Sequence, residues 1–253
     1  MTKQEGLEDK KYYFFSDVHL GLKSKEEEKQ KERRVVDFLE SAGADAGKIY
    51  IVGDLFDCWI EYRKVVPKGY FRLLTKLNEI SESGIEINFL SGNHDFWLNT
   101  YLRDDVGMKI HYGPVEFEKD SKKFYIVHGD GLSKGDIGYK ILKKILRSRV
   151  NQFLYSWIHP DIGLSIAQGS SKTSRNYTEE ASRSSDAMKD FAEKKISEGY
   201  DFVIMGHYHK PQQIEMDTPG GSGYYITLGD WIRNNSYGVY SKGKFELKFW
   251  GKS

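Results

Sequence analysis

Short apolar runs that stop at a polar residue or a glycine recur along the chain. The clearest, Ile49–Val52, is followed by a glycine and then by Asp54. A run rich in β-branched and aromatic residues that ends in this way predicts a buried strand opening into a loop. The same layout recurs in four other apolar runs, which lead to Asp17, Asn93, His128 and His207. Each predicted strand therefore delivers an oxygen or imidazole group at its carboxyl end.

Two segments between these runs have the periodicity of helices. One extends from Ser24 to Ser41 and is rich in alternating charges over residues 25–34, which are typical of a solvated helix face. The other extends from Pro67 to about Ser83 and places apolar residues on one face, namely Phe71, Leu74, Leu77 and Ile80. The resulting order β-α-β-α-β predicts a largely parallel sheet with right-handed crossovers.

From Val115 onward the pattern predicts strands joined by turns. Val115–Glu118 and Lys123–Val127 indicate a hairpin. Four later runs indicate consecutive strands with Gly-rich turns, over 212–216, 224–228, 237–241 and 244–250. We expect a second, mostly antiparallel sheet, packed face to face with the first and with helices outside. Such packing would gather the donor-bearing loops along one edge.

The segment between His128 and Phe202 has no strand pattern. Tyr139–Ile158 has apolar residues at helical spacing with Lys and Arg between them, and Pro160 is expected to end this helix. A small, polar, cationic connector over 168–177 and a helix from about 178 to 198 follow. The first helix is either a core helix with a solvated basic side or a surface helix that covers an amphiphilic ligand.

Composition limits the class of protein. The 253 residues are 39% hydrophobic, which is enough to fill a real core, and the formal net charge of +1 means that any preference for anions must come from local patches or metal ions. A single cysteine, Cys58, excludes an internal disulfide and suggests a reducing compartment. No apolar run approaches the ~18 residues of a membrane span, so we expect a cytoplasmic protein. No basic stripe with interleaved aromatics outside the insertion supports nucleic-acid binding, and no obligate protein partner is evident.

The donors at the strand ends are the strongest chemical signal. They are oxygen and imidazole groups without a thiolate, a set that suits Mn²⁺, Fe²⁺, Zn²⁺ or Mg²⁺. A lone loop histidine is more often structural, but four of the seven histidines lie beside strand ends, which argues against that explanation for all of them. Two ions about 3.5–4 Å apart need a bridging ligand, and Asp54 is the natural candidate. The candidate metal ligands are Asp17, His19, Asp54, Asn93, His128, His207 and His209.

Five ordered motifs resemble the blocks of the calcineurin-like metallophosphoesterases. They are Asp17-Val18-His19, Gly53-Asp54-Leu55-Phe56-Asp57, Gly92-Asn93-His94-Asp95, His128-Gly129-Asp130 and Gly206-His207-Tyr208-His209. The resemblance spans residues 12–210. It implies an α/β fold, a four-layer αββα sandwich of two mixed sheets with a helical insertion, in a single domain over 1–253.

The resemblance also implies roles for the candidate residues. One ion would be held by Asp17, His19, Asp54 and His209, and the other by Asp54, Asn93, His128 and His207. We expect two divalent ions, with Mn²⁺ first and Fe²⁺, Zn²⁺ or Mg²⁺ as alternatives. His94 would lie near the leaving-group oxygen, either as its proton donor or as a supporting hydrogen-bond donor, and Asp57 would orient it.

Within the family the chain is most similar to the branch that cleaves the pyrophosphate of UDP-2,3-diacylglucosamine in lipid A biosynthesis. The similarity lies in residues 53–60, 206–211 and 228–231 and in an insertion of about 133–195, which would be a lid over acyl chains. It implies a nucleotide-lipid substrate and peripheral contact with the inner leaflet of the membrane on the cytoplasmic side. Candidates for contacting the nucleotide are Lys172, Arg175, Asn176 and Tyr177.

Two positions depart from the best-known members of that branch. Those members carry Arg where this chain has His94, and Glu where it has Asp57. The differences leave open a calcineurin-like phosphodiesterase or phosphatase that acts on another phosphoester, or a separate group of enzymes with the same activity. A non-catalytic scaffold is a third alternative, although the motifs are all intact.

Overall fold

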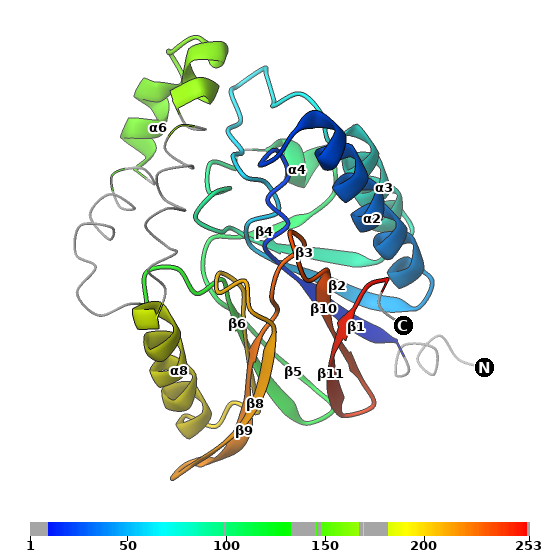
Figure 1. The fold of residues 1–253 in the computed structure, drawn as a ribbon, viewed down its shortest axis with the longest axis vertical. Coiled ribbons are helices and arrows are strands. Elements are labelled where there is room, and N and C mark those ends of the chain that lie inside the picture. The colour runs from blue at the N-terminus through cyan, green and yellow to red at the C-terminus, as the bar shows by residue number, and fades with distance from the viewer. Residues whose placement is uncertain are drawn as a thin grey trace.

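Two β-sheets form the centre of the protein (Figure 1). The computed structural model describes residues 10–98, 100–132, 145, 148–166, 169 and 182–251. The first sheet has the strand order β11-β10-β1-β2-β3-β4. Its strands are β1 (Lys11–Phe15), β2 (Ala46–Val52), β3 (Glu86–Leu90), β4 (Lys109–His111), β10 (Ser236–Ser241) and β11 (Lys244–Phe249). The second sheet has the order β5-β6-β7-β9-β8. Its strands are β5 (Val115–Lys119), β6 (Lys122–Val127), β7 (Phe202–Met205), β8 (Gln212–Thr218) and β9 (Gly221–Thr227).

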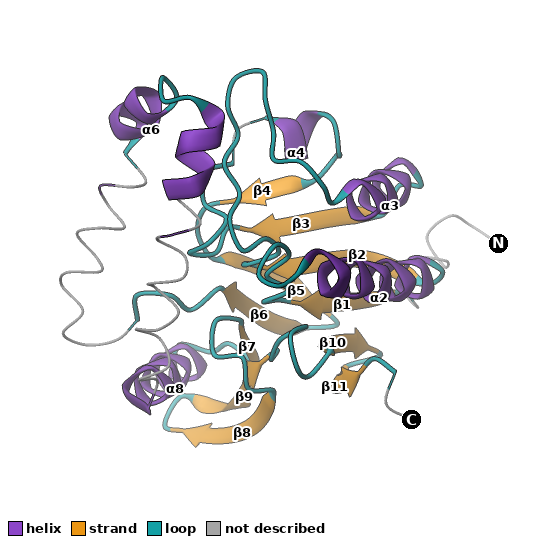
Figure 2. Ribbon diagram, turned by 45° about the horizontal axis from the view of Figure 1, so that its top comes forward, coloured by secondary structure: helices purple, strands orange, loops and turns teal. Residues whose placement is uncertain are grey.

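Helices cover the outer faces of both sheets (Figure 2). α2 (Lys25–Gly43) and α3 (Phe71–Glu82) pack beside each other on the first sheet, and α8 (Ser182–Ser197) packs on the second. Two shorter helices, α4 (Tyr101–Asp104) and α6 (Arg149–Tyr155), complete the described helices that have named bounds. The α/β fold with four layers that the motifs implied is confirmed.

The alternation of side chains along each strand builds three apolar layers. In β1, Tyr13 and Phe15 face α2, whereas Phe14 faces the second sheet. In β7, Phe202 and Ile204 face the first sheet, and the residues between and after them face α8. Because successive residues of a strand point to opposite faces, a central strand with both faces covered must be apolar throughout. That requirement explains the uninterrupted hydrophobic runs in the sequence.

Parallel pairing places the ends of the predicted strands together. β1 pairs parallel with β2, β2 with β3, and β6 with β7. The five strand ends that precede candidate ligands are all carboxyl ends, at Phe15, Val52, Leu90, Val127 and Met205. Ligand sites of open α/β sheets lie beyond the carboxyl ends of the strands. The predicted gathering of the loops at one edge is confirmed.

The prediction of a mostly antiparallel second sheet that includes the last two strands is wrong. β6, β7 and β9 run parallel to one another, so that sheet is mixed rather than mostly antiparallel. The last two strands do not belong to it, because β10 pairs antiparallel with β1 and β11 with β10. Hydrophobic alternation shows that a segment is a strand, but the partner of β10 lies more than two hundred residues away, at Tyr12↔Tyr240 among others.

The start of the second helix also differs from the prediction. α3 begins at Phe71 and not at Pro67, because Gly69 and Tyr70 have positive φ angles of 102° and 59° and interrupt any helix there. The Tyr70 hydroxyl donates to the carbonyl of Leu20 at 3.2 Å, a tertiary contact that holds this turn. Phe71, expected on the buried face, is 77% exposed.

The predicted insertion is described only in part. α6 lies in the second half of the expected helix 139–158, of which residues 139–144 and 146–147 lie outside the described residues. The helix ends at Tyr155, before Pro160, so the prediction that Pro160 ends it is wrong; Pro160 instead opens a further helical stretch over 160–166. The last part of the insertion is α8, whose Met188, Ala192 and Ile196 form the apolar layer against the second sheet. In the described part of the chain, no helix has the length and apolar character needed to cross a bilayer.

Candidate metal centre

The loops after β1, β2, β3, β6 and β7 bring all seven candidate ligands into one site. Asp17, His19, Asp54 and His128 are 0–2% exposed and form its floor. Asn93, His207 and His209 are partly exposed and form its rim. The site is therefore buried at its base and reaches the surface on the side of the rim residues.

Asp17, His19 and His209 form a first cluster whose ligand atoms could hold one metal ion. The Nε2 atoms of His19 and His209 are 3.3 Å apart, and Asp17 Oδ1 lies 3.4 Å from Nε2 of His209 and 3.7 Å from Nε2 of His19. The other carboxylate oxygen of Asp17 accepts the backbone N–H of His207 at 2.9 Å. One oxygen is thus anchored, and the other faces the two imidazoles.

Asp54, His128 and His207 form a second cluster, joined by the amide of Asn93. Asn93 Oδ1 lies 3.1 Å from His128 Nε2 and 3.1 Å from His207 Nδ1. Asp54 Oδ2 lies 3.3 Å from His128 Nε2 and 3.6 Å from His19 Nε2, so this carboxylate reaches both clusters. Its other oxygen accepts the backbone N–H of His94 at 3.0 Å.

The backbone of the site is held in an unfavourable conformation. Five of the seven candidates have positive φ angles, namely Asp17 (54°), His19 (47°), Asp54 (53°), His207 (66°) and His209 (47°). Each such residue costs on the order of 1–3 kcal/mol, and such strain persists only where the surrounding structure fixes it. The concentration of this strain at the strand ends is a physical mark of a functional site.

Two glycines of the motifs are required by the close packing of the ligands. A Cβ atom at Gly92 would lie 2.0 Å from Asp54 Oδ1, and one at Gly53 would lie 2.3 Å from His128 Nδ1. Gly53 also has a φ of 82°, which favours glycine. Any side chain at either position would displace a candidate ligand.

The hydrogen bonds of His128 and its charged neighbour favour a protonated ring. Nδ1 donates to the carbonyl of Val52 at 2.9 Å, and Nε2 faces the oxygens of Asn93 and Asp54. Both nitrogens therefore face acceptors, which favours the imidazolium. Burial opposes that charge, but the Asp54 carboxylate outweighs it and raises the pKa of His128 to about 10.

The other histidines and carboxylates of the site differ in the direction of their pKa shifts. Burial opposes the charge of His209 as well, and the carboxylates of Asp17 and Asp230 raise its pKa to about 10. His207 is different, because burial and the charge of His128 lower its pKa to about 4 and leave it neutral. Although burial disfavours its charge, contacts with His19 and His209 hold the pKa of Asp17 well below its ordinary range. Protons on imidazoles thus balance the buried carboxylates.

His94 stands beside the two clusters. One of its ring nitrogens lies within 4.8 Å of ligand atoms of both His19 and Asp54. Its Nδ1 lies 3.1 Å from the carbonyl oxygen of Asp57 and 4.0 Å from the Asp57 carboxylate, whose Oδ1 is closer to His19 Nδ1 at 3.5 Å. Asp57 thus contacts His94 mainly through its backbone and faces His19 with its side chain.

Two buried carboxylates behind the ligands hold their loops. Asp95 accepts the backbone N–H groups of Gly92, Asp54 and Phe56 at 2.8–3.2 Å and so joins the loops after β2 and β3. Asp230, which is not among the site residues predicted from the sequence, places Oδ2 3.5 Å from His209 Nδ1.

The other oxygen of Asp230 caps the turn that follows it. Asp230 Oδ1 accepts three successive backbone N–H groups, those of Ile232, Arg233 and Asn234, at 2.8–3.2 Å. A carboxylate behind a histidine fixes the orientation of the imidazole, as is common where histidines bind metals. The signal for it was present, since Leu228-Gly229-Asp230 repeats the pattern of Val52-Gly53-Asp54.

The arrangement fits a pair of divalent cations. Among the described side chains, buried Asp17 Oδ1 and His19 Nδ1 make no hydrogen bond. An orphaned, fully buried carboxylate oxygen close to two imidazole nitrogens is explained by a cation at that point. The donors are oxygen and nitrogen only, and Cys58 contributes no thiolate, because burial raises the pKa of its thiol to about 12.

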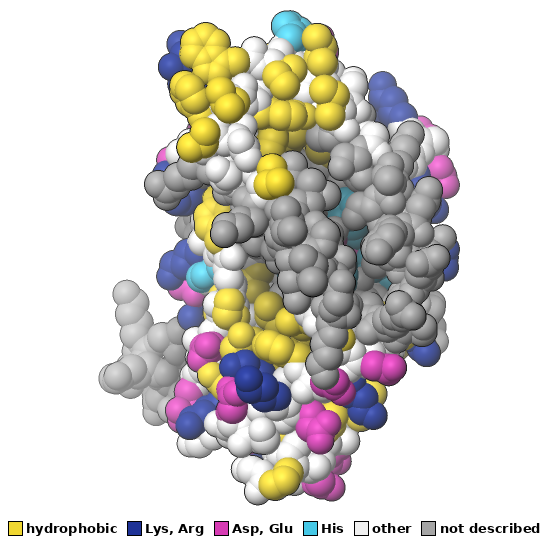
Figure 3. Space-filling model, turned by 90° about the vertical axis from the view of Figure 1, so that its left-hand side faces the viewer, with side chains coloured by type: hydrophobic (Ala, Val, Ile, Leu, Met, Phe, Trp, Pro, Cys, Tyr) yellow, Lys and Arg dark blue, Asp and Glu magenta, His cyan; other side chains and the backbone are white. Residues whose placement is uncertain are grey.

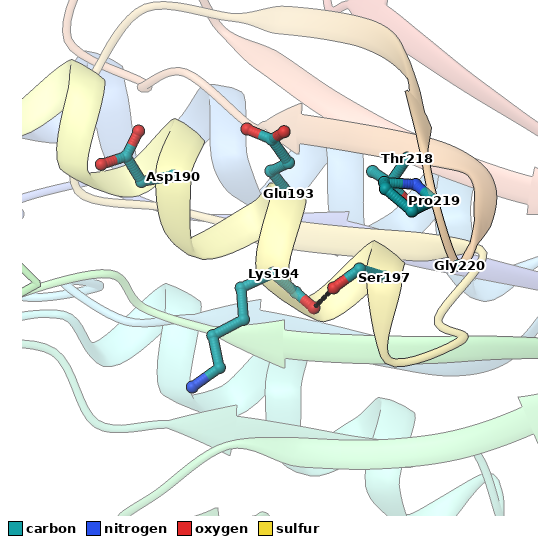
Figure 4. A pocket seen from close by; sticks show the side chains of 7 residues that line it. All are labelled: Asp190, Glu193, Lys194, Ser197, Thr218, Pro219 and Gly220. Carbon is teal, nitrogen blue, oxygen red and sulfur yellow. Dashed lines mark hydrogen bonds between the residues drawn. The ribbon is translucent and has the colours of Figure 1, made fainter.

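Two features lie apart from this site. The four candidates for nucleotide contact, Lys172, Arg175, Asn176 and Tyr177, lie outside the described residues. A surface groove of about 680 Å³ lies between α8 and the turn that joins β8 to β9, and none of the candidate ligands lines it (Figure 4).

Comparisons with known proteins agree with the motifs. Residues 10–211 match the family model for calcineurin-like phosphoesterases. The chain is 34% identical over 248 residues to the UDP-2,3-diacylglucosamine hydrolase of Porphyromonas gingivalis, a match that covers 91% of this chain and 94% of that protein. It is 30% identical over 227 residues to the enzyme of the same name from Histophilus somni, covering 88% and 92%. Among solved structures, it is similar to the E. coli phosphoesterase Yfce, with 16% identity, 95% and 93% coverage and a TM-score of 0.48.

Proposed function

The chain belongs to the calcineurin-like phosphoesterases, and on that premise we propose that it hydrolyses the pyrophosphate bond of UDP-2,3-diacylglucosamine. The products would be 2,3-diacylglucosamine 1-phosphate and UMP, in lipid A biosynthesis. The names of the two curated relatives support this substrate, and both relatives match the chain over most of its length, including the insertion.

The observation that carries the lipid part of the proposal is the apolar surface of α6 and the helical stretch after it. Phe153, Leu154 and Trp157 are 62%, 60% and 78% exposed, and Ile162 and Ile166 are 57% and 53% exposed. Hydrophobic side chains gather at that end of the molecule (Figure 3). Contiguous exposed apolar surface is typical of a binding site, and two acyl chains would cover it.

This surface is in contact with the loop that carries two of the site residues. The ring of Tyr155 in α6 packs edge-on against Trp97, with centroids 4.4 Å apart, and Trp97 follows His94 by three positions. Behind α6, the Tyr155 hydroxyl donates to the carbonyl of Gly163 at 2.6 Å. The proposed acyl-binding lid is the part of the insertion that precedes α8, since α8 packs against the second sheet as a layer of the sandwich.

The proposed metal ligands follow the two clusters. One ion is assigned to Asp17, His19, Asp54 and His209, and the other to Asp54, Asn93, His128 and His207. Oxygen and imidazole donors without a thiolate suit Mn²⁺, Fe²⁺, Zn²⁺ and Mg²⁺. Mn²⁺ is the ion proposed first. When bound, the ions supply Lewis acidity, which lowers the pKa of water and neutralises charge that develops on the phosphoryl oxygens.

His94 is proposed to serve the leaving group. A carbonyl oxygen can only accept, so the contact with Asp57 places a proton on His94 Nδ1 and leaves Nε2 without one in the neutral ring. Burial lowers the pKa of His94, so the ring is neutral near pH 7 before substrate binds. An anionic pyrophosphate beside the ring favours the imidazolium, whose Nε2–H can protonate the departing oxygen.

Two further contacts complete the proposal. The cationic connector, with Lys172, Arg175, Asn176 and Tyr177, is proposed to contact the nucleotide part of the substrate. The exposed apolar side chains of α6 are proposed to rest peripherally on the inner leaflet of the membrane, from which a diacylated substrate must be taken. On this proposal the protein works on the cytoplasmic side.

The experiment that tests the proposal compares three substrates with purified, Mn²⁺-loaded protein. They are UDP-2,3-diacylglucosamine, the same UDP-sugar without acyl chains, and bis(p-nitrophenyl) phosphate. We expect release of UMP from the diacylated substrate with the highest kcat/KM of the three. Equal kcat/KM for the acylated and deacylated UDP-sugars would contradict the lipid substrate and leave a metallophosphoesterase of other specificity.

A second candidate function is a phosphodiesterase or phosphatase that acts on another phosphoester. The observation that favours it is His94 itself, since this imidazole stands where the best-known enzymes of the branch carry Arg. Preference for the small diester over both UDP-sugars in the same experiment would select this alternative.

A further inference from the structure

A buried lysine lies behind the metal centre, in a segment whose charge pattern predicts a solvated helix face. Lys31 of α2 is only 2% exposed, although it belongs to the charged run 25–34. Its Nζ donates to the backbone carbonyl of His19 at 2.7 Å and lies 3.0 Å from Glu28 Oε1. The prediction of a fully solvated charge run is wrong at this position, because one of its charges points into the protein.

Glu28 extends the contact along the loop after β1. Its Oε2 accepts the backbone N–H of Gly21 at 2.8 Å, and its Oε1 accepts that of Lys23 at 2.8 Å. The ammonium of Lys31 and the carboxylate of Glu28 together therefore hold one carbonyl and two N–H groups of residues 19–23. This pair forms a clamp, here called the Lys31–Glu28 clamp, between α2 and the loop that carries His19.

The loop needs such a hold because its backbone is strained. His19 has a φ of 47°, in the left-handed region, which is uncommon for residues other than glycine and costs free energy that surrounding contacts must offset. Burying an ammonium is itself unfavourable unless its hydrogen bonds are satisfied. A buried charge whose hydrogen bond goes to the backbone of a candidate ligand is difficult to explain as solubility or helix stability.

We propose that Lys31, together with Glu28, is a positioning residue for the metal centre: it fixes the backbone of His19 so that the imidazole stands with Asp17 and His209. The inference rests on the proposed function as a metal-dependent phosphoesterase and assigns this role within it. Lys31 contacts the first cluster and not the second, which is joined by Asn93 from the loop after β3. Loss of the clamp therefore weakens one ion much more than the other.

The test measures Mn²⁺ binding to the metal-free protein rather than hydrolysis. Lys31→Met keeps the length of the side chain and removes the ammonium. We expect calorimetry to show about 10–100-fold weaker binding at one of two sites, the range typical for removing a group that orients a metal ligand. With two Mn²⁺ ions supplied per protein molecule, the electron paramagnetic resonance spectrum of the wild type should be that of a coupled ion pair. The spectrum of Lys31→Met should be that of a single ion.

A matched control lies on the same helix. Lys29 pairs with Glu26 at 3.6 Å with the same three-residue spacing, but its side chain is 52% exposed. Lys29→Met should leave both Mn²⁺ affinities unchanged. Weakening by Lys29→Met equal to that by Lys31→Met would overturn the proposal, because the effect would then follow from the charge of the helix and not from the contact with His19.

A second variant separates positioning from stability. Replacing both members of the clamp, by Glu28→Met and Lys31→Met, removes the unpaired buried charge, and apolar replacements of buried ion pairs are often neutral for stability. We expect this double variant to unfold at a higher temperature than Lys31→Met, which leaves the Glu28 carboxylate without its ammonium partner, while the loss of Mn²⁺ affinity at one site remains. Recovery of both affinities along with stability, or equal weakening of both sites, would overturn the positioning role. A wild-type protein that binds no Mn²⁺ would overturn the proposed function, and this role with it.

Discussion

Replacing both Phe153 and Trp157 by alanine should weaken binding of the diacylated substrate without unfolding the protein. The two side chains are 62% and 78% exposed, so most of their apolar surface is still available to a ligand. Complete burial of a large apolar side chain contributes ~1.5–3 kcal/mol, so covering the remaining surface would contribute about 1–2 kcal/mol for each. The double substitution should therefore raise KM roughly 30- to 1000-fold.

The assay separates this effect from a general loss of activity. KM and kcat are measured with UDP-2,3-diacylglucosamine and, in parallel, with bis(p-nitrophenyl) phosphate, which has no acyl chains. Hydrolysis of the small diester and the unfolding temperature should both stay near the wild-type values, because exposed side chains contribute little to folding. Phe71→Ala serves as the control, since Phe71 is 77% exposed but lies at the start of α3 and not on α6.

Two results would refute the reasoning. Equal losses on both substrates would mean that α6 supports the fold or the metal centre and does not bind the acyl chains. An unchanged KM for the diacylated substrate would mean that the exposed apolar surface serves some other partner.

Four further predictions concern the metal centre. Asp54→Asn should abolish hydrolysis and reduce the content of both metals, because the Asp54 carboxylate lies 3.6 Å from His19 Nε2 and 3.3 Å from His128 Nε2. Near-normal turnover with both metals retained would contradict the bridging role. His94→Ala should lower kcat by roughly 10²–10⁴-fold while metal content stays normal, and loss of metal instead would make His94 a ligand or a support. Metal binding near pH 8 should release at least two protons, because the pKa values of His128 and His209 are raised to about 10 when no cation is bound. The metal affinity should therefore rise about tenfold per pH unit for each displaced proton. Calorimetry in buffers of different ionisation enthalpy measures the protons released, and a count of zero would contradict this prediction. The free energy of unfolding of the metal-free protein should instead fall as pH rises. The stabilisation from these imidazolium groups is complete below the ordinary histidine pKa of 6.5 and is lost as pH rises through about 10.

The parts of the fold that depend on local pattern could be predicted from the sequence. The strands before Asp17, Asp54 and Asn93 are apolar throughout because both faces of the first sheet are covered, and such runs are easily recognised. The recurrence of a donor after each run then located the site, since parallel strands bring their carboxyl ends together.

The parts that depend on distant partners could not be predicted. The alternation in β10 and β11 indicated strands, but nothing local distinguishes pairing with β1 from pairing with β8 or β9. The late start of α3 depends on Tyr70, whose left-handed backbone is held by a hydrogen bond to the carbonyl of Leu20. Lys31 has the same sequence context as its solvated neighbours, and only the course of the loop after β1 makes its position a buried one.

Charged groups of the protein compensate one another at the candidate metal centre. Asp17 and Asp54 are buried carboxylates that would repel each other strongly if nothing opposed them, yet both keep low pKa values because protonated imidazoles lie within 4 Å of their oxygens. The left-handed backbone at the candidate ligands is held by groups of the protein, such as Asp95, which accepts the N–H of Asp54, and Asn234, whose side-chain amide donates to the carbonyl of His209. On the proposed function, a cation that binds here takes the place of protons on imidazoles that face the same carboxylates.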